Sequence, residues 1–222
     1  KHYGGLLKFT LIETGDLERH KMSRDNAEFW FDPICPWAWM TSRWILEVTK
    51  VRPVNVKWNL FSLAHLNRDK ELSDEYKSKL IKSWQTTRVI AAAQRLKGDE
   101  ITLPLYTAIS SRIHIGKREV ELSLFEEALS EIGLPTDLAK SAEDESLNEI
   151  VIESHERGIK LVGNDVGTPI ISVNGTAFFG PVISPAPKGE EAGKLWDGVL
   201  GVASYPGFFE IKRSRTVGPI FD

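Results

Sequence analysis

The clearest structural signal in the chain is FWFDPICPWAW, residues 29–39. Aromatic residues within 27–32 are typical of a short strand, and Pro36 suits the first turn of a helix, where its missing N–H would have no partner. Apolar residues then recur at helical spacing until Pro53 ends the pattern. Residues 54–60 alternate with a period of two, which predicts a second strand. The first part of the chain is therefore predicted to form a β-α-β unit.

Helical patterns dominate the middle of the chain, from Leu66 to Gly158, where a glycine is expected to end the last helix. The helices expected in this block cover residues 73–97, 103–115, 119–132 and 147–157. Strand patterns return in residues 168–173 and 176–180, and the Asn-Gly pair between them predicts a hairpin. A last helix is expected from Gly189 to about Leu200.

This order of elements is the skeleton of an α/β domain of the thioredoxin type with helices inserted into it. We predict a thioredoxin-like domain built from residues 25–66 and 160–222, and a helical insertion at 67–159. Residues 1–24 are expected to be an N-terminal extension or tag, with Met22 as the natural start.

The composition argues against several classes of function. The chain has 222 residues, with 28 Lys and Arg against 31 Asp and Glu and a net charge of −3, so no nucleic-acid partner is expected. No apolar run approaches the roughly 20 residues that span a bilayer, so no membrane association is expected. The single cysteine, Cys35, fits a reducing, cytoplasmic location. We expect no metal, because His155-Glu156 lacks the second histidine of a zinc-protease helix.

Cys35 is the candidate nucleophile, because it falls at the predicted turn from strand to helix. Unpaired N–H groups and the positive end of the helix dipole favour a thiolate there, whereas Asp32 would oppose ionisation if it lay close. The alternative is that Cys35 is a small buried apolar residue. Ala38 stands where a Cys-x-x-Cys pair would have its second cysteine.

Several runs of the sequence resemble, in order, the actinobacterial mycothiol-dependent members of the DsbA-like thiol-disulfide oxidoreductases, which include reductases of nitro compounds. The likeness extends from about residue 28 to 222. It is carried by FWFDPICPW (29–37), TSRWILEV (41–48), DVGTP (165–169), FFGPV (178–182), GEEAGKLWD (189–197) and ASYP (203–206).

The resemblance implies a thioredoxin-like core with a helical insertion, a Cys-Pro-Trp-Cys active site, and mycothiol as the reducing co-substrate. On this chain it assigns the nucleophile to Cys35, with Pro36 and Trp37 beside it, and the resolving position to Ala38. Ala38 is either a natural alanine or a cysteine replaced to trap an intermediate, and the close match elsewhere favours replacement. The resemblance also implies a cis-proline loop at 168–169, although Thr168-Pro169 taken alone favours an ordinary turn.

Other residues are weaker candidates for binding the thiol or its substrate. Trp37 either stacks on a flat substrate or belongs to the core, and His114 either binds the thiol and moves protons or ends a helix. Asn67 and Tyr76 either line a polar pocket for a sugar or act as helix caps and surface.

The predicted mechanism is attack of the Cys35 thiolate on a disulfide, which gives a mixed disulfide that Ala38 cannot resolve. An external thiol, either mycothiol or a redoxin, would then release it. One alternative is an enzyme similar to the kappa-class glutathione transferases, and another is a non-catalytic peptide- or thiol-binding protein. A homodimer through the aromatic C-terminal tail also remains open.

Overall fold

The computed structural model describes residues 24–221 and centres on a four-stranded sheet in the order β2-β1-β3-β4. β1 pairs in parallel with β2 and antiparallel with β3, which in turn pairs antiparallel with β4. The pairing of β1 with β3 joins the β-α-β unit to the later hairpin, and the predicted α/β class is confirmed. The strands are β1 (Asp25–Phe31), β2 (Val54–Leu60), β3 (Ile170–Val173) and β4 (Thr176–Phe179).

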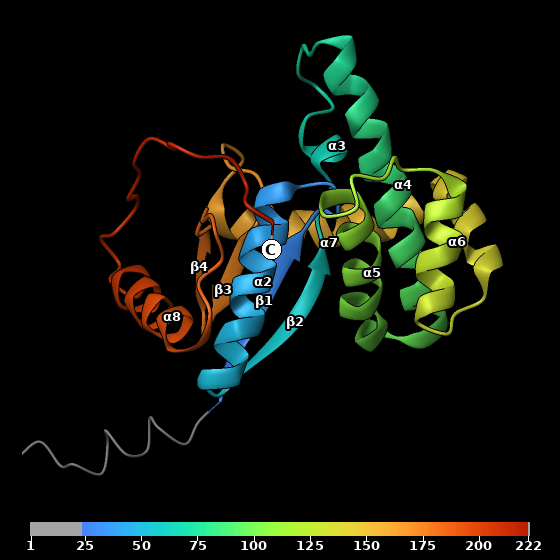
Figure 1. Ribbon diagram of the computed structural model, residues 1–222. Coiled ribbons are helices and arrows are strands. Elements are labelled where there is room, and N and C mark those ends of the chain that lie inside the picture. Colours follow the sequence, from blue (N-terminus) through green and yellow to red (C-terminus); the bar gives the residue numbers. More distant parts are fainter. Residues whose placement is uncertain (1–23, 222) are drawn as a thin grey trace, which may run out of the picture.

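Two helices, α2 (Pro36–Val51) and α8 (Gly189–Ala203), pack side by side against the sheet (Figure 1). The indole N–H of Trp44 in α2 donates to the carbonyl of Ala192 in α8 at 3.1 Å. At the far end of α2, Arg52 forms ion pairs with two acidic residues of α8 at 2.8 and 2.7 Å. These contacts fix the C-terminal helix to the helix that follows Cys35.

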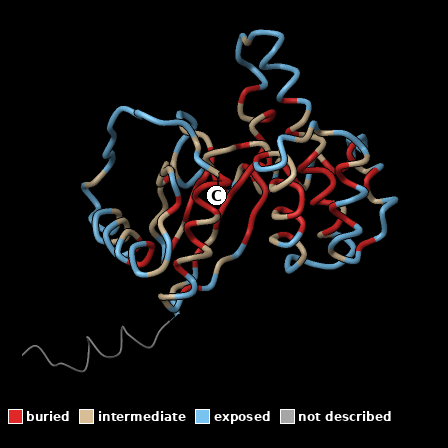
Figure 2. Tube along the Cα trace, in the orientation of Figure 1, coloured by how far each residue is buried: buried red, intermediate tan, exposed pale blue. Residues whose placement is uncertain are grey.

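Most of the predicted helical insertion lies beyond the β2 edge of the sheet, and α4 (Asp74–Lys97) projects from it (Figure 1). By contrast, α7 (Asn148–Val162) packs against the sheet, with contacts to β2 and β4. The other helices of the insertion are α5 (Thr102–His114) and α6 (Leu122–Glu131), with short 3-10 segments at Asp99–Ile101, Thr136–Glu143 and Glu145–Leu147. The short helix α3 (Leu63–Leu66) lies just before the predicted start of the insertion. Buried residues run without a break from the sheet into these helices (Figure 2). The proposed domain boundaries stay a prediction, and α7 continues across the one at 159–160.

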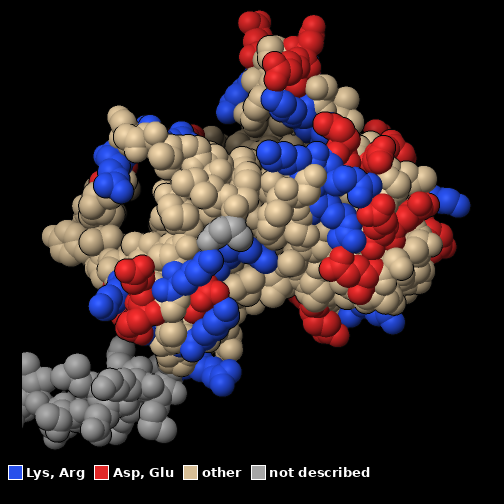
Figure 3. All heavy atoms as spheres, in the orientation of Figure 1, with Lys and Arg blue, Asp and Glu red and all other residues tan. Residues whose placement is uncertain are grey.

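Charge on the visible face is mixed over the insertion, where Lys and Arg side chains alternate with Asp and Glu, while the centre of the face is mostly uncharged (Figure 3). Across residues 24–221, no helix combines the length and the apolar character that crossing a bilayer requires.

Local signals in the sequence place several element ends correctly. The side chain of Ser73 caps α4 by accepting from the N–H of Tyr76, and Gly98 ends the helix with a φ of 87°. The hairpin turn has positive φ at both central positions, 50° at Asn174 and 86° at Gly175. A side chain at the second of these positions would be strained, which is why Asn-Gly predicts this turn.

Gly158 is a correction to the sequence analysis, because it lies inside α7 rather than at its end. The helix continues to Val162 and ends at Gly163, which has a φ of 93°. A Cβ atom at Gly158 would lie 2.9 Å from the indole ring of Trp30, whose N–H donates to the carbonyl of Ser154 at 2.9 Å. Glycine is therefore required for the close approach of α7 to β1, not for helix termination. The 3-10 segments were also missed, and α6 begins at Leu122 rather than at residue 119.

Gly158→Ala should destabilise the folded protein by about 1–3 kcal/mol, because the new methyl group forces Trp30 or α7 to move. This loss exceeds the roughly 0.5–1 kcal/mol that alanine adds in a helix. The matched control is Gly201→Ala in α8, where a Cβ meets nothing within 4 Å. Denaturant unfolding of both variants measures the difference, and equal midpoints would contradict the packing role of Gly158.

Candidate active site

Cys35 caps the N-terminus of α2, which confirms its predicted place at the turn after β1. Its Sγ atom accepts a hydrogen bond from the N–H of Ala38 at 3.4 Å. The thiol donates to the carbonyl oxygen of Thr168 at 3.5 Å. Pro36 occupies the first helical turn, as expected. The cysteine is thus held between a helix terminus and a loop that follows it by more than a hundred residues.

The loop opposite Cys35 is Thr168-Pro169, whose peptide bond is cis. The hydroxyl of Thr168 donates to the carbonyl of Trp30 in β1 at 2.7 Å, which ties the loop to the strand that carries the cysteine turn. The ordinary turn favoured by these two residues alone is therefore wrong, and the cis form implied by the family resemblance is present. A carbonyl already positioned against Sγ can accept a hydrogen bond from a thiol bound at the same place.

Asp32, three residues before the cysteine, is a fully buried carboxyl group. It accepts hydrogen bonds from the N–H of Leu63 at 2.7 Å, from the N–H of Ile34 at 3.0 Å and from the hydroxyl of Ser83. Burial raises the pKa of Asp32 to about 6, and these hydrogen bonds limit the rise. At neutral pH the carboxyl group is therefore mostly ionised and places a negative charge near the thiol.

The ionisation of Cys35 is a second correction. Burial raises the pKa of the thiol to about 12, and the charge of Asp32 adds to the rise, whereas the N–H groups of Ala38 and Trp37 oppose it. The expectation that the helix terminus would produce a low pKa is therefore wrong for this arrangement. The helix terminus acts in the predicted direction, but removal of water from a side chain that is only 7% exposed outweighs it.

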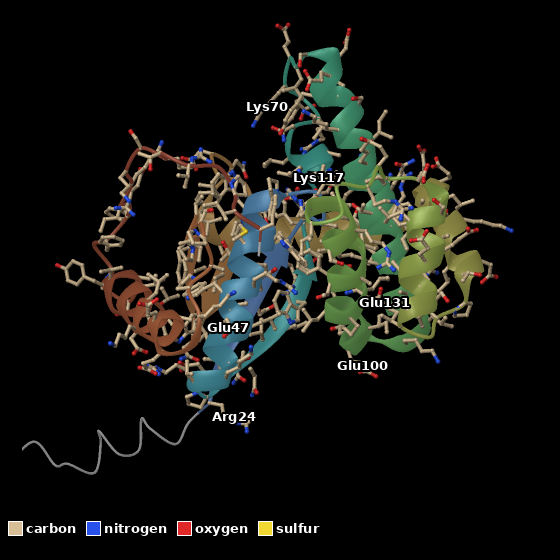
Figure 4. All side chains as sticks on the ribbon, viewed as in Figure 1. Arg24, Glu47, Lys70, Glu100, Lys117 and Glu131 are labelled. Carbon is tan, nitrogen blue, oxygen red and sulfur yellow. The ribbon has the colours of Figure 1, made fainter. Side chains whose placement is uncertain are left out.

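The insertion holds the cysteine turn through α5. Glu100 and Lys117 flank that helix at its opposite ends (Figure 4), and the end near Lys117 carries His114. The Nε2–H group of His114 donates to the carbonyl of Pro33 at 2.9 Å, and the hydroxyl of Ser110 donates to the same oxygen at 3.0 Å. Burial lowers the pKa of His114 to about 4, so the ring is neutral at physiological pH.

His114 therefore contacts the cysteine turn at Pro33, two residues before Cys35. Its role in binding a thiol stays a prediction. Ser110, which the sequence analysis missed, precedes it by one helical turn, a spacing that places both side chains on one face of a helix. Trp37 is partly buried, and the guanidinium carbon of Arg215 lies 5.0 Å from its ring centre. Arg215, in the C-terminal tail, had no signal in the sequence that would have marked it.

Asn67 and Tyr76 are not brought to the cysteine. Asn67 ends α3, and its side-chain amide donates to the carbonyl of Leu63 at 2.8 Å. Tyr76 lies in the first turn of α4 and is 38% exposed. Within residues 24–221 neither makes a hydrogen bond to Cys35, Trp37 or Thr168. Their helix-end positions agree with the capping and surface alternative, and the sugar-pocket role stays a prediction.

A cluster that the sequence did not show consists of His65, His155 and Glu156, whose candidate ligand atoms lie within 4.8 Å of one another. Nε2 of His65 is 3.1 Å from a carboxylate oxygen of Glu156, and Nδ1 of His155 accepts from the N–H of Ser62 at 3.4 Å. A neutral ring that accepts at Nδ1 carries its proton on Nε2, which leaves His155 no free lone pair for a metal ion. The cluster is therefore a hydrogen-bonded link between α3 and α7, and the expected absence of a metal stays a prediction.

Comparison with known proteins identifies relatives along most of the chain. A family model described as "Rv2466c-like: Mycothiol-dependent nitroreductase Rv2466c" matches residues 34–213, which include the cysteine turn and the cis-proline loop. A Mycobacterium tuberculosis protein, called uncharacterized protein Rv2286c, is 27% identical over 193 residues, which cover 86% of this chain and 83% of that protein.

Two solved structures are similar in fold. A probable DsbA oxidoreductase from Streptomyces coelicolor has a TM-score of 0.56 at 14% identity, covering 87% of this chain and 94% of that one. The cytosolic disulfide reductase DsbM from Pseudomonas aeruginosa, solved with GSH, has a TM-score of 0.52 at 15% identity, covering 79% of this chain and 99% of that one. These likenesses confirm the DsbA-like, thioredoxin-like fold.

Proposed function

Because this chain belongs to the Rv2466c-like family of mycothiol-dependent nitroreductases, we propose that Cys35 is the residue through which it acts as an oxidoreductase. The observation that carries the proposal is the position of the only cysteine, at the N-terminus of α2 and 3.5 Å from the carbonyl of Thr168. We propose mycothiol as the reducing thiol and the cytoplasm as the location, both on the strength of the family. A redoxin and a homodimer are further proposals from the sequence.

The proposed first step is attack of the Cys35 thiolate on one sulfur of a substrate disulfide. The old S–S bond breaks, a new one forms between Cys35 and one half of the substrate, and the other half leaves as a thiolate. A mycothiol thiolate then attacks the substrate sulfur of the mixed disulfide, which joins mycothiol to that half of the substrate and releases Cys35 as a thiolate. Since position 38 is alanine, no thiol of this chain stands at that place to resolve the mixed disulfide.

Thiols also supply the electrons that reduction of a nitro compound requires. Two thiols that join in one disulfide give up two electrons and two protons, which convert a nitro group to a nitroso group and water. We propose that Cys35 and mycothiol together provide this pair. Trp37, beside the cysteine and partly exposed, is the proposed surface for the flat ring of such a substrate.

When the protein is offered equal amounts of mycothiol disulfide and glutathione disulfide, intact mass should show a stable mycothiol adduct on most molecules. The adduct should persist because no second cysteine releases it. We expect at least about a tenfold preference for mycothiol, which corresponds to about 1.4 kcal/mol in the competition. The Cys35→Ser variant is the control and should carry no adduct.

The outcome separates the proposed function from its alternatives. A preference for glutathione would favour the enzyme similar to kappa-class glutathione transferases. An absence of any adduct, together with peptide binding that survives Cys35→Ser, would favour a non-catalytic binding protein. Either result would overturn the proposal that Cys35 works with mycothiol.

A further inference from the structure

The chain continues past α8 as a long segment that returns to the cysteine. It leaves the end of α8, arches away from the body of the protein and comes back to the front of α2 (Figure 1). Its middle is exposed, with Phe209 at 92% and Ile211 at 79%. Its last part, residues 215–221, makes specific contacts, and we refer to these residues as the C-terminal strap.

The strap is attached through Ser184 and through one aromatic ring. The hydroxyl of Ser184 donates to the carbonyl of Gly218 at 2.9 Å and accepts from the N–H of Ile220 at 2.8 Å. The ring of Phe221 stacks on His114, with 5.5 Å between ring centres and an interplanar angle of 27°. The strap thereby bridges the loop before α8 and the end of α5.

The strap contacts both sides of the cysteine turn. On one side Phe221 covers His114, which holds the carbonyl of Pro33, two residues before Cys35. On the other side Arg215 lies over the ring of Trp37, two residues after it, at 5.0 Å. Such a contact between a cation and an aromatic ring is weak at an exposed site. The strap therefore contacts one residue on each side of the turn, and few interactions hold it there.

Thiol-disulfide exchange needs more space than the turn provides. The attacked sulfur, its leaving group and Sγ have to lie nearly in line, but Cys35 is only 7% exposed. β1, α2 and the cis-proline loop are tied into the core by buried contacts, whereas most of the C-terminal tail is exposed. Segments with few buried contacts open at the lowest free energy. Among the segments around Cys35, the strap is thus the one that moves most easily.

We propose that the C-terminal strap is a roof over the thiol site that lifts to admit thiols and disulfides, and that it selects among them by size. Phe221 and Arg215 are its specificity-determining residues, because they cover the two side chains, His114 and Trp37, that flank the cysteine turn. A small reagent needs only a partial opening, whereas a molecule as large as a mycothiol disulfide needs the strap to leave His114. This inference rests on the proposed role of Cys35 as nucleophile.

Alkylation and disulfide exchange at Cys35 test the proposal without mycothiol, and each reports on one sulfur because the chain has one cysteine. Iodoacetamide is the small probe, and dithio-bis(nitrobenzoate), an aromatic disulfide, is the large one. Phe221→Ala removes the ring on His114, and Ser184→Ala removes both strap hydrogen bonds. The matched control is Phe209→Ala, the same substitution in the exposed part of the tail.

Both strap variants should react with the large probe about tenfold faster than the parent protein, and with the small probe less than about threefold faster. The reason is that the observed rate is proportional to the fraction of molecules in which the strap is open. The control should match the parent with both probes. Equal acceleration with both probes, accompanied by a lower unfolding midpoint, would show that the variants destabilise the whole fold. It would overturn the proposal that the strap covers the thiol site. Unchanged rates in both strap variants would overturn it as well. A missing mycothiol adduct would reject the proposed function while leaving these rates interpretable.

Discussion

At neutral pH, the thiol of Cys35 should be alkylated about a thousandfold more slowly in the folded protein than in the same protein unfolded in urea. Burial and the charge of Asp32 raise the pKa of this thiol from 9.0 to about 12, and each pH unit below the pKa leaves a tenfold smaller thiolate fraction. The unfolded chain is the ideal reference, because it contains the same single cysteine.

The pH dependence gives the sharper test. In the folded protein the alkylation rate should keep rising tenfold per pH unit beyond 9.0, the pKa of the unperturbed thiol, whereas the rate in urea should level off there. The raised pKa also contributes stability that is complete below 9.0 and lost as the pH rises towards 12, so unfolding becomes easier in alkali. A rate that levels off below pH 9.0 in the folded protein would show that a more open form, with an activated thiol, predominates in solution.

Asp32→Asn separates the two causes of the raised pKa. It removes the negative charge while leaving an oxygen that can accept from the N–H of Leu63 or of Ile34. The pKa of Cys35 should fall, and alkylation at fixed pH should accelerate severalfold. It should not reach the rate in urea, since burial is the larger cause. The variant Asp25→Asn, at the other end of β1, is the control and should leave the rate unchanged.

Ala38→Cys should shorten the lifetime of the Cys35–mycothiol adduct by at least about a hundredfold. The N–H of residue 38 is 3.4 Å from Sγ of Cys35, so a thiol placed there attacks from within the same helical turn. Intramolecular attack by an oriented group replaces a bimolecular step and gains orders of magnitude in rate. The new thiolate takes the place of mycothiol on Cys35, a disulfide closes within the chain, and mycothiol leaves as a thiolate.

Intact mass over time measures both the loss of the adduct and the loss of two hydrogens that marks the new disulfide. Ala38→Ser is the matched control, because its side chain adds one heavy atom without a thiol, and it should retain the adduct as the parent does. Position 38 is fully buried, and overfilling a packed site costs about 1–3 kcal/mol, so unfolding midpoints accompany the measurement. An equally long-lived adduct in Ala38→Cys would contradict a resolving role for this position.

Most of the fold could be predicted from local signals in the sequence. The limits of β2 follow from alternation alone, and the ends of α4 follow from Ser73 and Gly98, because caps act on the few residues beside them. The same reasoning failed at Gly158. A glycine is needed there because the ring of Trp30, more than a hundred residues away in the sequence, leaves no room for a side chain. A glycine that ends a helix and a glycine that admits a neighbouring ring look alike in a sequence. Only the packing of α7 on β1 distinguishes them.

The candidate site could be located from the sequence, but its electrostatics could not. The strand-to-helix turn and Pro36 placed Cys35 at a helix N-terminus, and the sequence also marked Asp32 as an opposing charge. The sign of the pKa shift depends on the loss of water around the thiol, and that loss comes from segments distant in the chain. The strap was missed for a similar reason, since residues 215–221 have no periodic pattern and acquire their role only through His114 and Trp37.

The two hydrogen bonds that the carbonyl of Pro33 accepts also limit which parts of the fold can be exchanged with a relative. Because one carbonyl of the cysteine turn is held by Ser110 and His114, the inserted helix α5 and the thioredoxin-like core are structurally coupled at this point. A chimera that combined the core of this chain with the insertion of a distant relative would keep the turn only if both side chains came with it.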